Sequence, residues 1–251
     1  MADSVSLTLV GGPTALLDYG GLRLLTDPTF SPPGEYEVAP GRSLTKTEPP
    51  ALAAPTDLDA VLLSHDQHPD NLDPAGRAVL DTAPLVITTI AAAGRLGGTA
   101  RGLASGQSLR LPGGLVEITA VPAQHGPPGC EARTGDVTGF LLTGVDLPTV
   151  YVSGDNASID IVRTIASRPI DIAVLFGGAA RTSLFDGAPL TLTAIDAVEA
   201  ARILDARRVV AIHVRGWAHF SEGSADVHAA FAAAGLVDRL VIPEPGKTVI
   251  L

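Results

Sequence analysis

The 251-residue sequence predicts an α/β protein with four layers (α/β/β/α), in which two β-sheets pack face to face and helices cover both outer sides. The first part of the chain consists mainly of strand patterns that follow one another directly, as in antiparallel sheets. The second part alternates strands with helical segments. No Pro/Gly/Ser-rich linker and no repeat of 20–50 residues separates the two parts. We therefore expect residues 1–251 to form a single domain.

The N-terminal quarter predicts three strands and a long loop. Residues 4–10 alternate polar and apolar side chains, which is the pattern of a half-buried strand, and a Gly-Gly-Pro segment ends it. Residues 15–19 and 22–26 predict a hairpin around two glycines. Residues 30–55 are rich in proline, glycine and charge, so we expect a long loop there, of the kind that is usually functional or mobile.

The rest of the chain predicts helices where a capping side chain precedes a periodic segment, and strands where short apolar runs lie between turn residues. The expected helices are 74–80 with Asp73 as N-cap, 91–96, 159–167, 194–204 with Thr193 as N-cap, and 225–234 with Ser224 as N-cap. The expected strands are 60–63, 86–88, 109–111, 116–121, 139–142, 150–153, 172–175, 209–212, 240–242 and 248–251.

Charge and hydropathy limit the classes of partner. The formal net charge is −10 and no cluster of five or more Lys and Arg occurs, so a small-molecule substrate is expected rather than a nucleic acid. No uninterrupted apolar stretch is long enough to cross a membrane, and residues 1–4 are polar and acidic, unlike the start of a signal peptide. We expect a cytoplasmic protein without a membrane partner; assembly into a homo-oligomer stays open.

Four apolar strands each end in side chains that bind metals. A single His or Asp at a strand end is commonly a surface or hydrogen-bonded residue, but four such ends together favour one distributed site on a shared edge. Imidazole nitrogen and carboxylate oxygen suit divalent Zn above all, with Mn, Fe and Ni as alternatives, and a bridging aspartate allows one or two ions. The candidate ligands are His65, His68, Asp70, His125, Asp155 and His213.

These segments resemble the metallo-β-lactamase fold superfamily, in particular the branch of metal-dependent hydrolases that is similar to ascorbate-6-phosphate lactonase. Residues 63–73 (LSHDQHPDNLD) stand where that branch has Ser-His-Asp-His-Tyr-Asp-His-Leu-Asp, and residues 24–28 (LLTDP) resemble one of its opening strands. Residues 122–125, 153–155 and 212–213 are similar to its loops with the third histidine, the bridging aspartate and the last metal histidine. The resemblance covers nearly the whole chain.

The resemblance implies the metallo-β-lactamase fold, which is the same α/β/β/α sandwich, and hydrolysis of a small ester, lactone or phosphoester by a metal-bound hydroxide. Asp70 or the bridging Asp155 would then be catalytic by steering the nucleophilic water. Two other readings stay open. One is a degenerate, non-catalytic binding or regulatory module, and the other is a di-iron redox protein.

The metal motif departs from the family's His-x-His-x-Asp-His by one extra residue. Aligned on its first histidine, the motif has Gln67 at the place of the second. Aligned on Asp70, it has Asp66 and His68 as its first pair and Asn71 at the place of the last histidine. An amide oxygen is a poorer ligand for zinc than imidazole. We hypothesise that His65, His68 and His125 hold a first metal and that Asp70, Asp155 and His213 hold a second, weaker one.

Other residues are candidates for supporting or substrate-binding roles. Asp27 either orients a ligand histidine or forms a turn before Pro28. Arg215 and His219 follow the last metal strand and either contact substrate or belong to a loop packed around Trp217. Gln67 and Asn71 belong to the same group. We expect loops 30–55, 126–137 and 177–190 to shape the substrate pocket.

Overall fold

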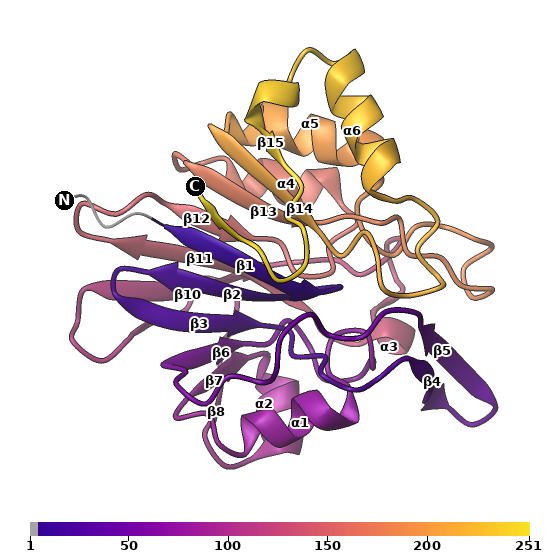
Figure 1. Cartoon of the computed structure of the whole chain (residues 1–251), viewed down its shortest axis with the longest axis horizontal. Coiled ribbons are helices and arrows are strands. Elements are labelled where there is room, and N and C mark those ends of the chain that lie inside the picture. The colour runs from indigo at the N-terminus through magenta and orange to yellow at the C-terminus, as the bar shows by residue number, and fades with distance from the viewer. Residues whose placement is uncertain (1–4) are drawn as a thin grey trace.

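Two seven-stranded sheets pack face to face in the computed structural model, which describes residues 5–251 (Figure 1). In spatial order, the first sheet consists of β16 (Thr248–Ile250), β1 (Ser6–Gly11), β2 (Thr14–Tyr19), β3 (Leu22–Thr26), β6 (Ala60–Leu62), β7 (Val86–Thr88) and β8 (Ala100–Gly102). The second consists of β15 (Leu240–Val241), β14 (Arg208–Ile212), β13 (Ile172–Phe176), β12 (Val150–Val152), β11 (Thr138–Gly144), β10 (Val116–Pro122) and β9 (Ser108–Arg110).

Helices cover the outer face of each sheet (Figure 1). α1 (Pro74–Leu80) and α2 (Ile90–Leu96) lie outside the first sheet, and α4 (Ile159–Ile165), α5 (Ala194–Leu204) and α6 (Ser224–Ala233) lie outside the second. A short helix, α3 (Glu131–Thr134), and a 3₁₀ turn, η1 (Val237–Arg239), complete the helical elements of the described residues. The prediction of an α/β/β/α sandwich is therefore confirmed.

Three buried apolar clusters lie between the four layers. The cluster between the sheets takes side chains from both, for example Leu17 and Phe140. A second cluster, which includes Val198 and Phe231, joins the second sheet to its helices, and a third, which includes Val61 and Val79, joins the first sheet to α1. Burial of this apolar area is the main term that stabilises the layers.

Strand direction places several carboxyl ends at one edge of the sandwich. β10 and β12 both pair antiparallel with β11, and β12, β13 and β14 are mutually parallel, so β10, β12 and β14 run the same way. In the first sheet β3, β6 and β7 are parallel to one another. The loops that follow these strands carry the candidate ligands, so the topology provides the shared edge that the sequence predicted.

The long loop predicted over residues 30–55 is wrong in part. β4 (Gly34–Ala39) and β5 (Arg42–Lys46) form a separate antiparallel hairpin, which projects from the sandwich beside α3 (Figure 1). The hairpin turns at Pro40-Gly41, where Gly41 has φ +72°. Glu35 and Glu37 alternate with less exposed neighbours along β4, but the segment is short and polar and lies between prolines, so its sequence pattern indicates part of a loop.

Other differences are small. The sequence missed β8 and α3, which are three and four residues long and too short to show periodicity. Ser224 is the first residue of α6 rather than its N-cap: Gly223 precedes the helix and its N–H donates to Asp226. The predicted helix bounds at 159–167 and 91–96 shift to those of α4 and α2. Residues 1–4, including Ser4 of the first predicted strand and the N-terminal segment expected to lack a signal peptide, lie outside the described residues.

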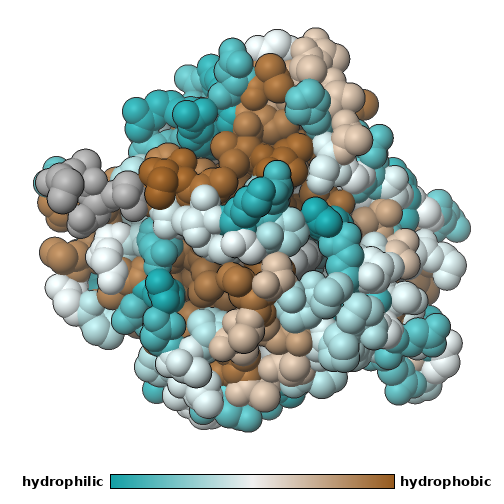
Figure 2. All heavy atoms as spheres, in the orientation of Figure 1, coloured by the Kyte–Doolittle hydropathy of each residue, from teal (hydrophilic) through white to brown (hydrophobic). Residues whose placement is uncertain are grey.

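None of the helices within residues 5–251 is long and apolar enough to cross a membrane. On the face shown in Figure 2, apolar residues gather over β15 and β16, the edge strands of the two sheets. Ile250 of β16 is 67% exposed.

Candidate metal centre

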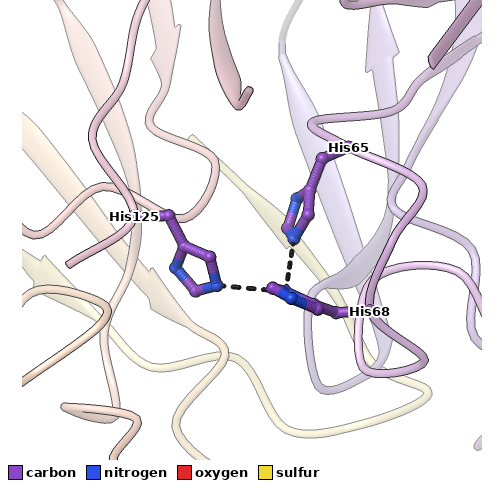
Figure 3. Close-up of side chains that lie close together, drawn as sticks. All are labelled: His65, His68 and His125. Atoms are coloured by element: carbon purple, nitrogen blue, oxygen red, sulfur yellow. Dashed lines mark hydrogen bonds between the residues drawn. The ribbon is translucent and has the colours of Figure 1, made fainter. Parts of the chain in front are cut away.

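Three imidazole rings from two loops converge on one point (Figure 3). His65 and His68 follow β6, and His125 follows β10. Nε2 of His65 lies 2.9 Å from Nδ1 of His68, and Nε2 of His125 lies 3.1 Å from the same Nδ1. We call His65, His68 and His125 the histidine cluster.

Hydrogen bonds on the far side of two rings determine what faces the centre of this cluster. Nδ1 of His125 lies 2.8 Å from the carbonyl oxygen of Leu190, which can only accept, so this nitrogen carries the proton. Nδ1 of His65 lies 2.9 Å from Oγ of Ser64, whose own proton goes to Asp27 at 2.7 Å, so this Nδ1 is also a donor. In the neutral rings, both Nε2 atoms therefore present lone pairs to the centre.

A cation satisfies this arrangement better than protons do. Nδ1 of His68 carries at most one proton, which cannot serve both facing lone pairs well. Burial lowers the pKa of His65 well below its ordinary value, and His68 and His125 lower it further. Burial and the neighbouring His125 lower the pKa of His68 to about 4. The rings of His65 and His68 are therefore neutral at pH 7, which is the state that binds a metal.

A second group, which we call the carboxylate cluster, consists of Asp70, Asp155 and His213. All three residues are buried, and one ligand atom from each lies within 4.8 Å of the others. Nε2 of His213 is 3.5 Å from Oδ2 of Asp70 and 3.8 Å from Oδ1 of Asp155. Among the described residues, both ring nitrogens of His213 and one oxygen of each carboxylate have no hydrogen-bond partner.

The charges of this cluster depend on each other. Burial by itself raises the pKa of Asp70, but His219 and His213 beside it bring that pKa well below its ordinary value. Burial by itself lowers the pKa of His213, but Asp155 and Asp70 raise it above its ordinary value. Two carboxylates thus favour positive charge between them, and a divalent cation can supply it in place of the His213 proton.

Asp155 lies between the two clusters. Its Oδ2 is 3.7 Å from Nε2 of His125, and its Oδ1 faces His213. A carboxylate with one oxygen toward each cluster has the placement of a bridging ligand, so the donor set fits two divalent ions as well as one.

Asn71 lies beside the carboxylate cluster and acts as a donor. Its Nδ2 donates to Asp27 at 3.1 Å and to Oδ1 of Asp155 at 3.3 Å. Oδ1 of Asn71 is buried without a partner among residues 5–251. In this orientation the Asn71 amide holds the carboxylates of Asp27 and Asp155 in place and does not act as a metal ligand.

Asp27 reaches the histidine cluster through Ser64, and it also lies at a turn. It is fully buried, has φ +28°, and accepts bonds from the N–H and the hydroxyl of Ser64. Burial raises its pKa to about 7, against the lowering effect of the bonds from Ser64. Through Ser64, Asp27 determines which nitrogen of His65 faces the cluster.

The structure decides between the two alignments of the metal motif. Asp66 pairs with Arg95 and belongs to neither group of metal-binding side chains, so it does not form a pair with His68 at the site. His65 and His68 occupy the first two positions, with the extra residue between them, and Asn71 takes the last position. Gln67 lines the neighbouring cavity, its Oε1 is buried without a partner in the described chain, and its side chain packs against Gly135.

The two candidates after β14 behave differently. Nε2 of His219 lies 3.0 Å from Oδ2 of Asp70, and His219 also lines the cavity. Arg215 does not reach the site: its guanidinium is held by Glu48 at 2.8 and 3.1 Å. Trp217 is buried against Gly12.

A cavity of about 510 Å³ opens onto both clusters through His68, His125, Asp70 and His219. Its walls come from the β4–β5 hairpin, from α3 and from residues 180–190, which are the three loops expected to shape the pocket. Four further groups at the site were not predicted from the sequence: Ser64, the Leu190 carbonyl, Arg133 and Arg181. Ser64 could have been found only from its position next to His65 in the sequence. The Leu190 carbonyl and the two arginines are far from the ligands in sequence and reach the site only through the fold.

Known proteins of related sequence and structure have the same overall form. The chain is 25% identical over 256 residues to a UPF0173 metal-dependent hydrolase of Pelotomaculum thermopropionicum, with 98% of this chain and 100% of that protein covered. It is similar in fold to the isothiocyanate hydrolase from Delia radicum gut bacteria, with 23% identity, TM-score 0.83, and 97% and 98% of the two chains covered.

A third relative is a protein of Veillonella parvula described as a possible metal-dependent hydrolase, with 18% identity, TM-score 0.84, and 99% of this chain and 100% of that chain covered. Residues 22–214, which include every candidate ligand from His65 to His213, match the family described as the β-lactamase superfamily domain. The chain therefore belongs to the β-lactamase superfamily.

Proposed function

We propose that this protein is a metal-dependent hydrolase of a small-molecule ester, lactone or phosphoester. The observation that carries the proposal is the convergence of imidazole nitrogens in the histidine cluster next to unpartnered carboxylate oxygens at the floor of a cavity. The names of the relatives support a metal-dependent hydrolase, and the lactone member of the substrate class rests on the resemblance to ascorbate-6-phosphate lactonase.

The residues divide the work as follows. Divalent ions held by the histidine and carboxylate clusters would lower the pKa of water and polarise the scissile group. Asp70 stays ionised, so its free Oδ1 can accept a hydrogen bond from the attacking water and steer it. His219 hydrogen-bonds to the other oxygen of Asp70. Asp155 contacts both clusters, with one oxygen near His125 and the other near His213. No serine or cysteine nucleophile is required.

The test is metal quantification on protein purified without added metal, followed by a panel of lactones, esters and phosphodiesters with the native metal. We expect turnover in the wild type and its loss in His125→Ala, with metal content reduced and far-UV circular dichroism unchanged. His228→Ala, on the exposed side of α6, is the matched control. Unchanged turnover in His125→Ala would refute the proposal.

We also propose that zinc is the native metal and that the carboxylate cluster binds its ion more weakly than the histidine cluster does. Asn71 replaces an imidazole and donates toward Asp155, so this cluster has one ligand fewer. One tight equivalent should survive exhaustive dialysis and the second should be lost. Two equivalents retained after dialysis would contradict the difference in affinity.

The histidine and carboxylate donors also suit iron, which keeps di-iron redox chemistry as a second candidate. Iron as the bound metal, with a visible absorption band and no hydrolysis of any substrate class, would favour that candidate. Metal binding without any turnover would favour the non-catalytic module.

A further inference from the structure

Three arginines line the cavity above the metal centre: Arg42 from β5, Arg133 from α3, and Arg181 from the segment after β13. The lining contains one carboxylate, that of Asp70. The chain as a whole has the opposite balance, with 27 Asp and Glu against 17 Lys and Arg. Positive charge is therefore concentrated at the cavity of an acidic protein.

Within residues 5–251 none of these three arginines forms an ion pair with Asp or Glu, whereas nine of the other fourteen Lys and Arg side chains do. The charges of the three arginines are thus available to a ligand.

Two of the three are held in place by uncharged groups. The Arg133 guanidinium lies 4.9 Å from the centre of the Phe185 ring. Nε of Arg181 donates to Ser221 at 3.0 Å, and its Nη1 donates to the carbonyl of Gly187. A guanidinium fixed in this way loses less conformational entropy when it binds an oxyanion, for which its planar fork is well suited.

The remaining wall is apolar. Leu44, Leu184, Phe185 and Leu190 line the same cavity, which is large enough for a drug-sized molecule. The cavity lining therefore combines apolar side chains, three arginines, and the histidines and Asp70 of the metal centre.

We propose that the substrate is an oxyanion: a small molecule with an apolar body and a carboxylate, phosphate or sulfate group remote from the bond that is hydrolysed. This group binds Arg133, assisted by Arg42 and Arg181, while the reacting group lies at the metal centre. The proposal names the substrate class of the same site and rests on the proposed function.

The binding test uses the metal-loaded full chain and two probes of matched shape, 4-phenylbutyrate and its neutral amide, 4-phenylbutyramide, in calorimetric titrations. We expect the acid to bind about tenfold or more tightly than the amide, with a preference that weakens as salt is added. The double substitution Arg42→Gln/Arg133→Gln should abolish the preference. Arg168→Gln removes one exposed, unpaired charge outside the cavity and should preserve it. Titration with 3-phenylpropylphosphonate then distinguishes a carboxylate site from a phosphate site.

Equal binding of acid and amide, or no binding of the acid, would overturn the proposal. A preference that survives the double substitution at full strength would also overturn the proposal, because the carboxylate would then depend on neither Arg133 nor Arg42.

A turnover comparison separates this proposal from the proposed function. A neutral ester and an ester with a remote carboxylate share the reacting group. Hydrolysis of both with equal kcat/KM would contradict the oxyanion site and leave the hydrolase intact. Arginine-dependent binding of the acid without hydrolysis of either ester would support the oxyanion site and contradict the proposed hydrolase function.

Discussion

Ser64 and the carbonyl of Leu190 each bind Nδ1 of one histidine, His65 and His125 respectively. Each thereby determines that Nε2 of its histidine faces the cluster. His213 shows a second local requirement. It has φ +59°, a conformation that costs a non-glycine residue about 1 kcal/mol or more. Its N–H donates to the carbonyl of Gly12 at 2.9 Å, which helps to hold the ring in the buried site.

His68 makes the stability of the metal-free protein depend on pH. Its folded pKa is about 4 and its ordinary value is 6.5, so between these values the unfolded chain binds more protons. Its contribution is complete above pH 6.5 and is lost as the pH falls toward 4. Denaturant unfolding of chelator-treated protein should show about 2 kcal/mol of this loss between pH 7 and pH 5.

The substitution His68→Gln should reduce the pH dependence by about that amount, because the titrating ring is gone. His228→Gln, on an exposed face of α6, should leave the dependence unchanged. A wild-type slope retained in His68→Gln would show that other groups cause it.

At the scale of elements, α1 connects the metal loop to the hairpin that walls the cavity. Its N-cap, Asp73, accepts bonds from the N–H groups of Phe30, Ser31 and Gly76. The buried ammonium of Lys46, at the end of β5, is 3.0 Å from the same carboxylate. One capping residue therefore fixes the helix, the loop after β3 and the base of the hairpin.

The close approach of α1 to that loop requires glycine at position 76. A Cβ there would lie 1.8 Å from the carbonyl oxygen of Pro28, which is backbone and cannot move away easily. Gly76→Ala should reduce the free energy of unfolding by about 2–3 kcal/mol, although alanine is the better helix former. Gly94→Ala in α2, where a Cβ meets nothing within 4 Å, should increase it by about 0.5–1 kcal/mol. Denaturant titration of both variants tests the contrast, and equal effects would contradict it.

At the scale of the whole molecule, the ligands come from both sheets. His65, His68 and Asp70 follow a strand of the first sheet, whereas His125, Asp155 and His213 follow strands of the second. Bound ions would therefore link the two halves of the sandwich at the edge where both leave polar groups buried.

Metal removal should lower the stability of the whole fold. At a free metal concentration a thousandfold above Kd, binding to the folded state contributes about 4 kcal/mol. Thermal unfolding with and without chelator should show a clear decrease in Tm, and readdition of metal should restore it. His125→Ala should show a smaller decrease. An unchanged Tm after verified metal removal would indicate that the ions do not join the sheets.

The sequence by itself determined the layers, most helices and strands, and the six candidate ligands that follow strand ends. These depend on local patterns: apolar periodicity, capping residues, and polar side chains where a buried strand ends. The β4–β5 hairpin escaped prediction because no residue of β4 and only Lys46 of β5 is buried, so neither strand carries the buried apolar run by which other strands were identified.

Only the tertiary structure decided which side chains of each loop face the centre. Asp66 and His65 are neighbours in sequence, yet one binds Arg95 and the other faces His68, because the direction of each depends on partners elsewhere in the fold. The same holds for Arg215, which pairs with Glu48, and for Arg133, which packs on Phe185 at the cavity and has no ion-pair partner within residues 5–251. Pairings of charges across long sequence distances arise from packing, and no local pattern in the sequence specifies them.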